Sequence, residues 1–196
     1  MKNQNKLNAI FILLLAVTIG LACSNSGSAG GSQTDDANKI VDQANKKLDE
    51  AKDLYVKTEK RNTELFNANI KTLQQLFYYK SKMGGEAKSI VADYEKVVEM
   101  LKDVSRQYDD ISRLNLNEKY KDYAKLKSDE YAKRAEAIGI RKGNAQAFME
   151  IDDPSTMMTK FDDNNSKSDR LFKDAEEIGA KAKKMEEEHK DLFRNA

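Results

Sequence analysis

The most regular pattern of apolar positions in the chain lies between Ala87 and Ile111. Apolar and aromatic residues recur there at alternating steps of three and four positions: Ala87, Ile90, Tyr94, Val97, Leu101, Val104, Tyr108 and Ile111. This spacing places the side chains along one face of a helix, like the a and d positions of a heptad repeat. The pattern predicts a helix over about residues 86–113 whose apolar face is buried by other helices.

A longer amphipathic segment precedes this helix and runs from about Ala37 to Lys82. Its apolar stripe consists of Ile40, Val41, Ala44, Leu48, Ala51, Tyr55, Leu65, Ile70, Leu73, Leu76 and Phe77. We expect Gly84 and Gly85 to end this helix, because glycine readily adopts the left-handed conformation of a tight turn between helices. The predicted first helix is therefore much longer than the second.

Two more helices are predicted in the second half of the chain. Asn115 and Glu118 have the spacing of a capping box, which predicts a third helix that ends near Glu150. Asp153 and Pro154 are residue types preferred at the N-cap and at the first position of a helix. They predict a fourth helix that continues almost to the end of the chain.

Residues 1–22 have the pattern of an export signal. Lys2 and Lys6 precede an uncharged, mostly apolar run from Ala9 to Ala22. As a helix, this run of about 14 residues would be ~21 Å long, too short to cross the ~30 Å hydrocarbon core of a membrane. The pattern therefore predicts a signal peptide that is cleaved off, and not a membrane-spanning helix.

The apolar run closes with Leu21-Ala22-Cys23, and Cys23 is the only cysteine in the chain. This segment resembles the lipobox of bacterial lipoprotein signal peptides, although Gly20 stands where those peptides usually carry Leu. The resemblance implies that the Cys23 thiol receives a diacylglyceryl group, that cleavage precedes Cys23 and that the new amino terminus is acylated. It also implies that Ser24 directs the protein to the outer membrane, if the cell has one. The alternative is an ordinary signal peptide cleaved near Ala22, which would leave a free thiol.

The remainder of the chain is predicted to form a tether and one helical domain. Residues 24–36 are rich in Gly and Ser and are expected to be a flexible coil that follows the lipidated Cys23. Residues 37–196 are expected to form an all-α, antiparallel, up-down-up-down four-helix bundle, because short connections force antiparallel neighbours. The first helix is expected to overshoot the second by about 18 residues, or ~27 Å. We therefore expect residues 37–55 and 183–194 to form a two-helix stalk at the membrane-proximal end.

Composition and charge agree with a highly solvated helical protein. Charged residues make up 34% of the chain and hydrophobic residues 39%, with one Pro and no Trp. The formal net charge is +1, and charges of both signs are interspersed. Nucleic-acid-binding proteins usually carry a one-sided basic surface. We therefore expect no nucleic-acid partner.

One candidate binding surface is predicted at the distal end of the bundle, away from the membrane. Aromatic and methionine side chains from different helices are expected to meet there: Phe77, Tyr78, Tyr79, Phe148, Met149, Met157, Met158 and Phe161. Methionine adapts its shape to varied apolar partners. The cluster is therefore either a surface for a partner or apolar ligand, or simply the packed end of the bundle. Tyr78 and Tyr79 are adjacent in a helix, so one of them is expected to be exposed.

Four polar residues fall where the helical pattern calls for apolar side chains. They are Thr58 and Asn62 on the first predicted helix, and Asn164 and Ser168 on the fourth. They are expected either to line a polar cavity or to fix the register of the helices.

No residue pattern indicates catalysis or a cofactor. Glu186 and His189 have the Glu-x-x-His spacing of bundle metal sites, but His189 is the only histidine, so one chain cannot complete a di-iron site. The chain has no Gly-rich phosphate loop and no G-x-S-x-G motif. The sequence favours a monomeric, lipid-anchored envelope protein that acts by binding an unknown envelope protein, without enzymatic activity or a metal. The alternative is a bundle that holds an apolar molecule or haem between its helices.

Overall fold

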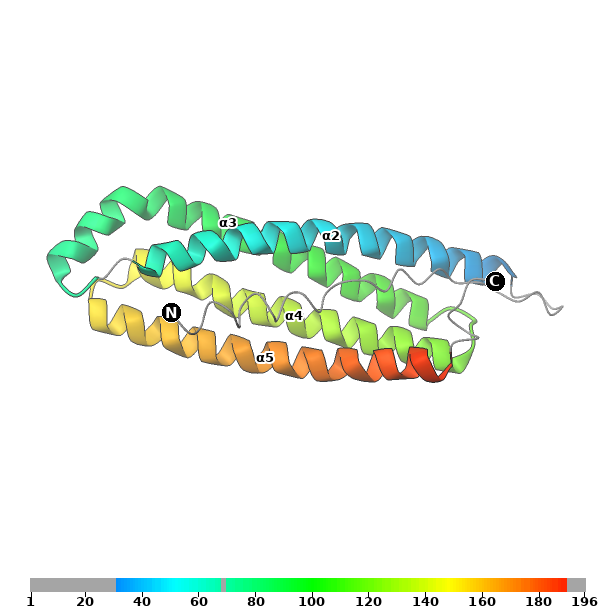
Figure 1. Ribbon diagram of the computed structural model, residues 1–196. Coiled ribbons are helices and arrows are strands. Elements are labelled where there is room, and N and C mark those ends of the chain that lie inside the picture. The colour runs from blue at the N-terminus through cyan, green and yellow to red at the C-terminus, as the bar shows by residue number, and fades with distance from the viewer. Residues whose placement is uncertain (1–30, 68–69, 190–196) are drawn as a thin grey trace.

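The computed structural model describes residues 31–67 and 70–189, which form four α-helices and no strand. In chain order, α2 covers Gly31–Asn67, α3 covers Leu73–Ser112, α4 covers Glu118–Glu150 and α5 covers Pro154–Glu188. Figure 1 shows the helices side by side along one long axis. The predicted all-helical bundle is therefore confirmed. The signal peptide, Cys23 and most of the tether lie outside the described residues, and α2 begins earlier than the predicted start at Ala37.

The first break between helices lies at residues 68–72 and not at the glycine pair, so the predicted helix from Ala37 to Lys82 is wrong. Thr72 is the N-cap of α3. Its hydroxyl accepts a hydrogen bond from the Gln75 backbone, and the Gln75 side chain accepts one from the Thr72 backbone, which is a capping box. The apolar stripe concealed this break, because Ile70 inside the break and Leu76 after it are both buried and continue the apolar pattern.

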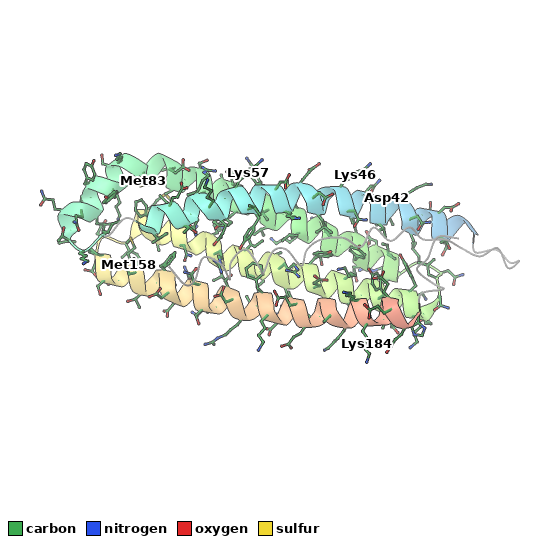
Figure 2. The ribbon with its side chains drawn as sticks, viewed as in Figure 1. Asp42, Lys46, Lys57, Met83, Met158 and Lys184 are labelled. Carbon is green, nitrogen blue, oxygen red and sulfur yellow. The ribbon has the colours of Figure 1, made fainter. Side chains whose placement is uncertain are left out.

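Gly84 and Gly85 lie inside α3, and neither has a backbone φ in the left-handed region. Figure 1 shows that the first turns of α3 lie at an angle to the remainder of the helix. Met83, which precedes the glycines, lies near this bend (Figure 2). Bends in helices commonly occur at glycine, which lacks the side chain that would pack along the helix. The pair therefore bends a helix where the sequence predicted a turn between two helices.

The four helices have similar lengths, of 37, 40, 33 and 35 residues for α2 to α5. The predicted stalk is not confirmed, because it was derived from a length difference that disappears once the break moves to residues 68–72. None of the described helices is both long and apolar enough to span a membrane.

Side-chain pairs show how successive helices are oriented. Between two neighbouring helices, the contacting residues have rising numbers along one helix and falling numbers along the other, so the two helices are antiparallel. The pairs are Lys47–Asp103 and Arg61–Glu86 between α2 and α3, Ser105–Ser128 and Lys142–Glu95 between α3 and α4, and Arg141–Asp169 and Asn144–Asn165 between α4 and α5. The connection between α3 and α4 also contacts the start of α2, where the Asn115 backbone N–H donates to Gln33.

The apolar face predicted from Ala87 to Ile111 is buried along its whole length in α3.

Two predicted helix starts have different outcomes. Asp153 is confirmed as the N-cap of α5, where it accepts a hydrogen bond from the Thr156 backbone at 2.7 Å and precedes Pro154. The capping box of Asn115 with Glu118 is wrong, because the N-cap of α4 is Asn117. Leu114 and Leu116 pack against the core, and the connection turns at this point, where the Leu116 backbone N–H donates to the Leu114 carbonyl at 2.9 Å.

The glycine pair provides a test of the continuous helix α3. Replacing Gly84 or Gly85 by Ala is expected to raise the free energy of unfolding by about 0.5–1 kcal/mol at each site, because alanine favours helix more than glycine does. Nothing lies within 4 Å of a Cβ added at either position, so the new methyl groups meet no obstacle. Urea unfolding followed by circular dichroism measures the change.

Gly143 is the matched control, because a Cβ there would lie 2.9 Å from Asn164 Nδ2 and would force a shift. Gly143→Ala is expected to lower the stability. A loss of stability in Gly84→Ala and Gly85→Ala as well would contradict a helix through both positions and would support a turn.

Candidate functional site

A layer of buried polar side chains crosses the middle of the bundle. Its members come from α2, α4 and α5, and each is less than a tenth exposed: Thr58, Glu59, Asn62, Arg141, Asn144, Asn164 and Ser168. We call this group the buried polar layer. The four polar residues singled out in the sequence all belong to it. Its two charged members, Glu59 and Arg141, were missed, because charged side chains on amphipathic helices usually face solvent.

Arg141 is the centre of this layer. Its Nη1 donates to Glu59 Oε1 on α2 at 2.6 Å, and its Nη2 donates to Asp169 Oδ1 on α5 at 2.5 Å. Its Nε also donates to the Ser168 hydroxyl at 3.3 Å. The side chains of Arg141 and Glu59 are 5% and 9% exposed, whereas that of Asp169 is 55% exposed. One guanidinium therefore connects three helices, with a carboxylate on each side.

The fourth helix joins the layer through Tyr94 of α3. Its hydroxyl donates to Glu59 Oε2 at 2.5 Å, so both oxygens of the buried carboxylate are hydrogen bonded. The ring of Tyr55 lies 6.2 Å from those of Tyr94 and Phe172, measured between centroids. Aromatic side chains therefore enclose the ion pair and keep it away from solvent.

Burial and neighbouring charge shift the pKa values of the groups in and around this layer. Burial raises the pKa of Tyr55 and of Tyr94, and the negative charge of Glu59 raises both further. Burial acts to lower the pKa of Arg141, but Glu59 and the other neighbouring acidic groups outweigh it and raise that pKa overall. These two phenols and the guanidinium keep their protons at neutral pH, so none of them is suited to exchange protons with a substrate.

The packing around the layer is close. Gly143 lets Asn164 approach α4, because a Cβ at position 143 would lie 2.9 Å from Asn164 Nδ2. Asn62 Oδ1, Asn144 Oδ1 and Asn164 Nδ2 have no hydrogen-bond partner among the described residues. Buried polar atoms without partners lower the stability of a protein. A polar layer can nevertheless fix the alignment of helices, which is the best attested role of polar positions in helical interfaces. The layer is therefore a structural feature that fixes register.

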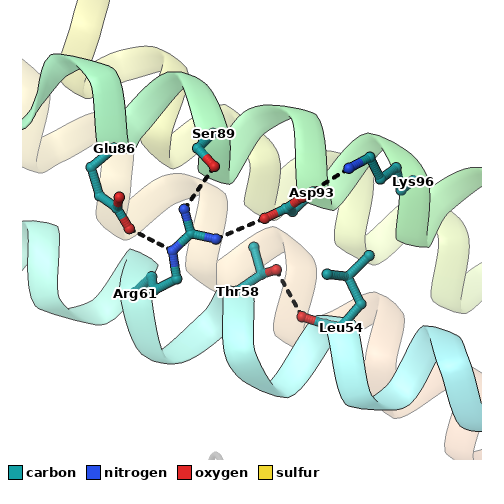
Figure 3. Close-up of polar contacts among 7 residues, drawn as sticks. All are labelled: Leu54, Thr58, Arg61, Glu86, Ser89, Asp93 and Lys96. Carbon is teal, nitrogen blue, oxygen red and sulfur yellow. Dashed lines mark hydrogen bonds and ion pairs between the residues drawn. The ribbon is translucent and has the colours of Figure 1, made fainter.

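A second polar group joins α2 to α3 at a more exposed position (Figure 3). The guanidinium of Arg61 donates to Glu86 at 2.5 Å, to Ser89 at 2.8 Å and to Asp93 at 2.7 Å. Thr58 lies one turn earlier in α2, and its hydroxyl donates to the Leu54 carbonyl within the same helix at 2.7 Å. Arg61 and Glu59 therefore hold neighbouring positions of α2 against two different helices.

A third group lies on α4, where Glu130 faces Gly179 of α5. Glu130 accepts hydrogen bonds from Lys127 at 2.6 Å and from Arg134 at 2.9 and 3.0 Å. A Cβ on Gly179 would lie 2.9 Å from the Glu130 carboxyl carbon. The small residue on α5 makes room for the charged group on α4, so this arrangement also serves the packing of two helices.

The structure divides the aromatic and methionine cluster predicted at the distal end. Phe148 and Met157 are fully buried, and Tyr79, Met149 and Met158 pack at the edge of the core. Phe161 is partly buried and stacks on Phe66 of α2 with 4.1 Å between ring centroids. Phe66 was missed in the sequence, although it also contacts Phe148 with 6.2 Å between centroids. This part of the cluster is the packed end of the bundle.

The exposed part of the cluster lies on the first turns of α3. Phe77 and Tyr78 are 55% and 59% exposed, and Leu73 one turn before Phe77 is 54% exposed. We call Leu73, Phe77 and Tyr78 the tip patch. The expectation that Leu73 and Phe77 face inward is wrong, because α3 starts anew at Leu73 and only Leu76 of its first two turns is buried. Val56 on α2 is the other large hydrophobic residue that is widely exposed in the described chain.

Glu186 and His189 do not form a metal site in this structure. The backbone N–H of His189 caps the end of α5 by donating to the Met185 carbonyl at 3.1 Å. Partial burial raises the pKa of the Glu186 carboxyl. Within residues 31–67 and 70–189, no three His, Cys, Asp or Glu side chains gather closely enough to hold a metal ion.

Comparison of the chain with protein-family models, with curated proteins and with solved structures finds no match. The inference of function therefore rests on the geometry of the buried polar layer and the tip patch, together with the amino-terminal sequence.

The ion pair between Arg141 and Glu59 is expected to be important for stability. Arg141→Met leaves the Glu59 carboxylate buried without its cation and is expected to lower the free energy of unfolding by about 3–5 kcal/mol. Lys142→Met is the matched control, since it removes only the exposed pair with Glu95 and is expected to cost less than about 1 kcal/mol. Urea unfolding of both variants measures the difference.

The double variant Glu59→Leu with Arg141→Met removes both charges of the pair. It is expected to be more stable than Arg141→Met alone, because no uncompensated charge then remains buried. Equal losses in Arg141→Met and Lys142→Met would contradict the central role of the ion pair.

Alkaline unfolding is expected to follow from the buried tyrosines. Burial raises the pKa of Tyr55, Tyr94, Tyr108, Tyr123 and Tyr131 above the ordinary value. In the unfolded chain tyrosine ionises near pH 10, so above that pH the folded state binds more protons than the unfolded state does. The stability from these groups is complete below about pH 10 and is lost as the pH rises further. Tyrosinate absorbance and helical circular dichroism should change together, and ionisation of these tyrosines in a folded bundle would contradict this.

Proposed function

We propose that this protein is a lipid-anchored protein of the cell envelope that acts as a structural and interaction module, without enzymatic chemistry. The observation that carries the proposal is the tip patch, where three large apolar side chains are exposed within six residues of α3. Single exposed apolar residues are common, whereas groups of them mark interaction sites. The amino-terminal resemblance to lipoprotein signal peptides supports an anchor at Cys23, and Ser24 favours the outer membrane in a cell that has one.

The anchor and the tip patch belong to opposite ends of the bundle in this proposal. The chain enters the bundle at Gly31, and the patch follows the connection after Asn67 at the other end of α2. A helix of 37 residues is about 55 Å long, which gives the separation of the two ends. The up-down-up-down course of the helices thus joins a membrane-proximal end to a distal end, and similar helix lengths make a separate stalk unnecessary.

The polar chemistry of the interior supports a structural role. Arg141 already binds Glu59, Ser168 and Asp169, so its guanidinium is occupied within the protein. The members of the layer are buried, and Asn164 is the one among them that borders the open groove between α4 and α5. We therefore propose no cofactor and no reaction, and we propose that the chain acts as a monomer.

A bundle that holds an apolar molecule or haem has less support. The space between the helices is filled by side chains such as Tyr94, Phe148 and Phe172, which are fully buried. A groove between α4 and α5 is open to solvent and is bordered by charged residues such as Glu150 and Lys160 as well as by apolar ones such as Ile140 and Ile151. This groove is poorly suited to enclose an apolar ligand.

Photo-crosslinking in cells tests the proposal. A benzophenone amino acid in place of Phe77 is expected to form adducts with envelope components, whereas the same group in place of Val56 is the exposed control and should form few. Cys23→Ala is expected to move the protein from the membrane fraction to the soluble fraction when the membranes are washed with high salt, which screens attraction to charged lipid. Retention of Cys23→Ala in salt-washed membranes would refute the anchor, and identical adducts at positions 77 and 56 would refute the interaction surface.

A further inference from the structure

We propose that the tip patch docks on an anionic lipid membrane surface. This inference deepens the proposed function and rests on its assignment of the tip patch as the interaction surface, since it names what the patch binds. It does not depend on lipidation of Cys23.

The apolar part of the patch has the character of a membrane-interface anchor. Leu73 and Phe77 are one helical turn apart and share a face of α3, and Tyr78 adds an aromatic ring with a polar hydroxyl. Leucine and phenylalanine on interfacial helices insert into the boundary between headgroups and acyl chains. Tyrosine is enriched at the same depth, because its ring is apolar and its hydroxyl remains hydrated.

The charge around the patch selects for anionic lipid. Between Leu65 and Gly85 the sequence contains Lys71, Lys80 and Lys82 and no Asp or Glu. Lys80 is already paired with Asp152 at 2.7 Å, and Lys82 Nζ lies over the Tyr78 ring at 5.9 Å from its centroid. Lys71 and Lys82 are exposed and form no ion pair with another described residue. Basic residues beside interfacial aromatics are attracted to the negative potential of anionic lipid surfaces.

The patch is attached to the bundle at two points and lies at one end of the molecule. Leu76, between Leu73 and Phe77 in sequence, is fully buried, and the pair between Lys80 and Asp152 ties α3 to the connection between α4 and α5. Figure 1 shows the first turns of α3 at one extreme of the molecule, before the bend. A membrane would therefore meet the exposed side chains without any rearrangement of the bundle.

The extent of the patch favours a membrane over a protein partner. A stable protein interface buries about 800 Å² on each partner, which three half-exposed side chains do not provide. Interfacial binding needs only a few apolar side chains beside basic residues, with the negative lipid surface supplying the attraction. The small patch with neighbouring lysines therefore suits a lipid surface.

A single-tryptophan reporter tests this inference directly, because the natural chain contains no tryptophan. Phe77→Trp is placed in the full-length protein, and Val56→Trp, also exposed but on α2, is the matched control. Vesicles of phosphatidylglycerol and phosphatidylcholine with brominated acyl chains are added. We expect a blue shift and strong quenching of the fluorescence of Trp at position 77, and no change at position 56. Neutral phosphatidylcholine vesicles should give neither effect.

Charge reversal tests the electrostatic part. Lys71→Glu with Lys82→Glu, in the Phe77→Trp background, is expected to weaken vesicle binding at least tenfold, and added salt should weaken the binding of the unreversed reporter. The proposal is overturned if the emission of Trp at position 77 does not respond to anionic vesicles, if it responds equally to neutral ones, or if it responds only to added envelope proteins. Tyr78→Trp repeats the test if Phe77→Trp fails to fold.

The anionic surface is that of a membrane facing the one that holds the anchor, because the anchor and the tip patch belong to opposite ends of the bundle. The lipidated protein is reconstituted in neutral vesicles and anionic vesicles are added, and clustering together with the tryptophan response is expected. A second sample is reconstituted in anionic vesicles alone, and a response without clustering would show docking on its own membrane and would contradict this placement. The Cys23→Ala chain should still bind anionic vesicles through the patch, so failure of the anchor and failure of this proposal give different results.

Discussion

The buried contact between Arg141 and Glu59 is the constraint on which the position of α2 depends. The apolar residues that α2 buries in its first half are small, chiefly Ala37, Val41, Ala44 and Ala51, and small side chains do not define a unique alignment between helices. The ion pair does, because a shift of α2 by one turn would leave a carboxylate and a guanidinium buried without their partners. Tyr94 and Asp169 extend the same constraint to α3 and α5. The bundle therefore combines an apolar core with a polar layer that specifies register.

The features that the sequence predicted correctly are local ones. The seam from Ala87 to Ile111 and the cap at Asp153 depend on residues a few positions apart, and both are present in the structure. The break before α3 is also local, since Thr72 and Gln75 form a capping box that the sequence displays. It was overlooked because the apolar period continues across it and because a glycine pair offered a more conspicuous end.

The features that the sequence did not reveal depend on contacts between distant parts of the chain. Glu59 and Arg141 are ordinary amphipathic-helix charges until folding brings them within 2.6 Å of each other. In the same way, only the folded structure shows that Phe66 of α2 covers Phe161 of α5 and that Phe77 and Tyr78 are the exposed members of the predicted cluster. Residue type indicated that aromatic side chains gather at this end, but tertiary contacts determine which of them remain in water.

The polar attachment of α2 has a mechanical consequence if the protein is tethered at its amino-terminal end, as we propose. Tension applied through the amino-terminal segment enters the bundle at Gly31 and acts along α2 before it reaches any other helix. The small apolar side chains of α2 nearest its amino terminus would separate from the bundle first. The hydrogen bonds of the Arg61 guanidinium and the Glu59–Arg141 pair would then resist further separation of α2. The hydrogen bonds of these pairs are lost within a short displacement, so α2 would resist the load until they break and would then separate from the bundle.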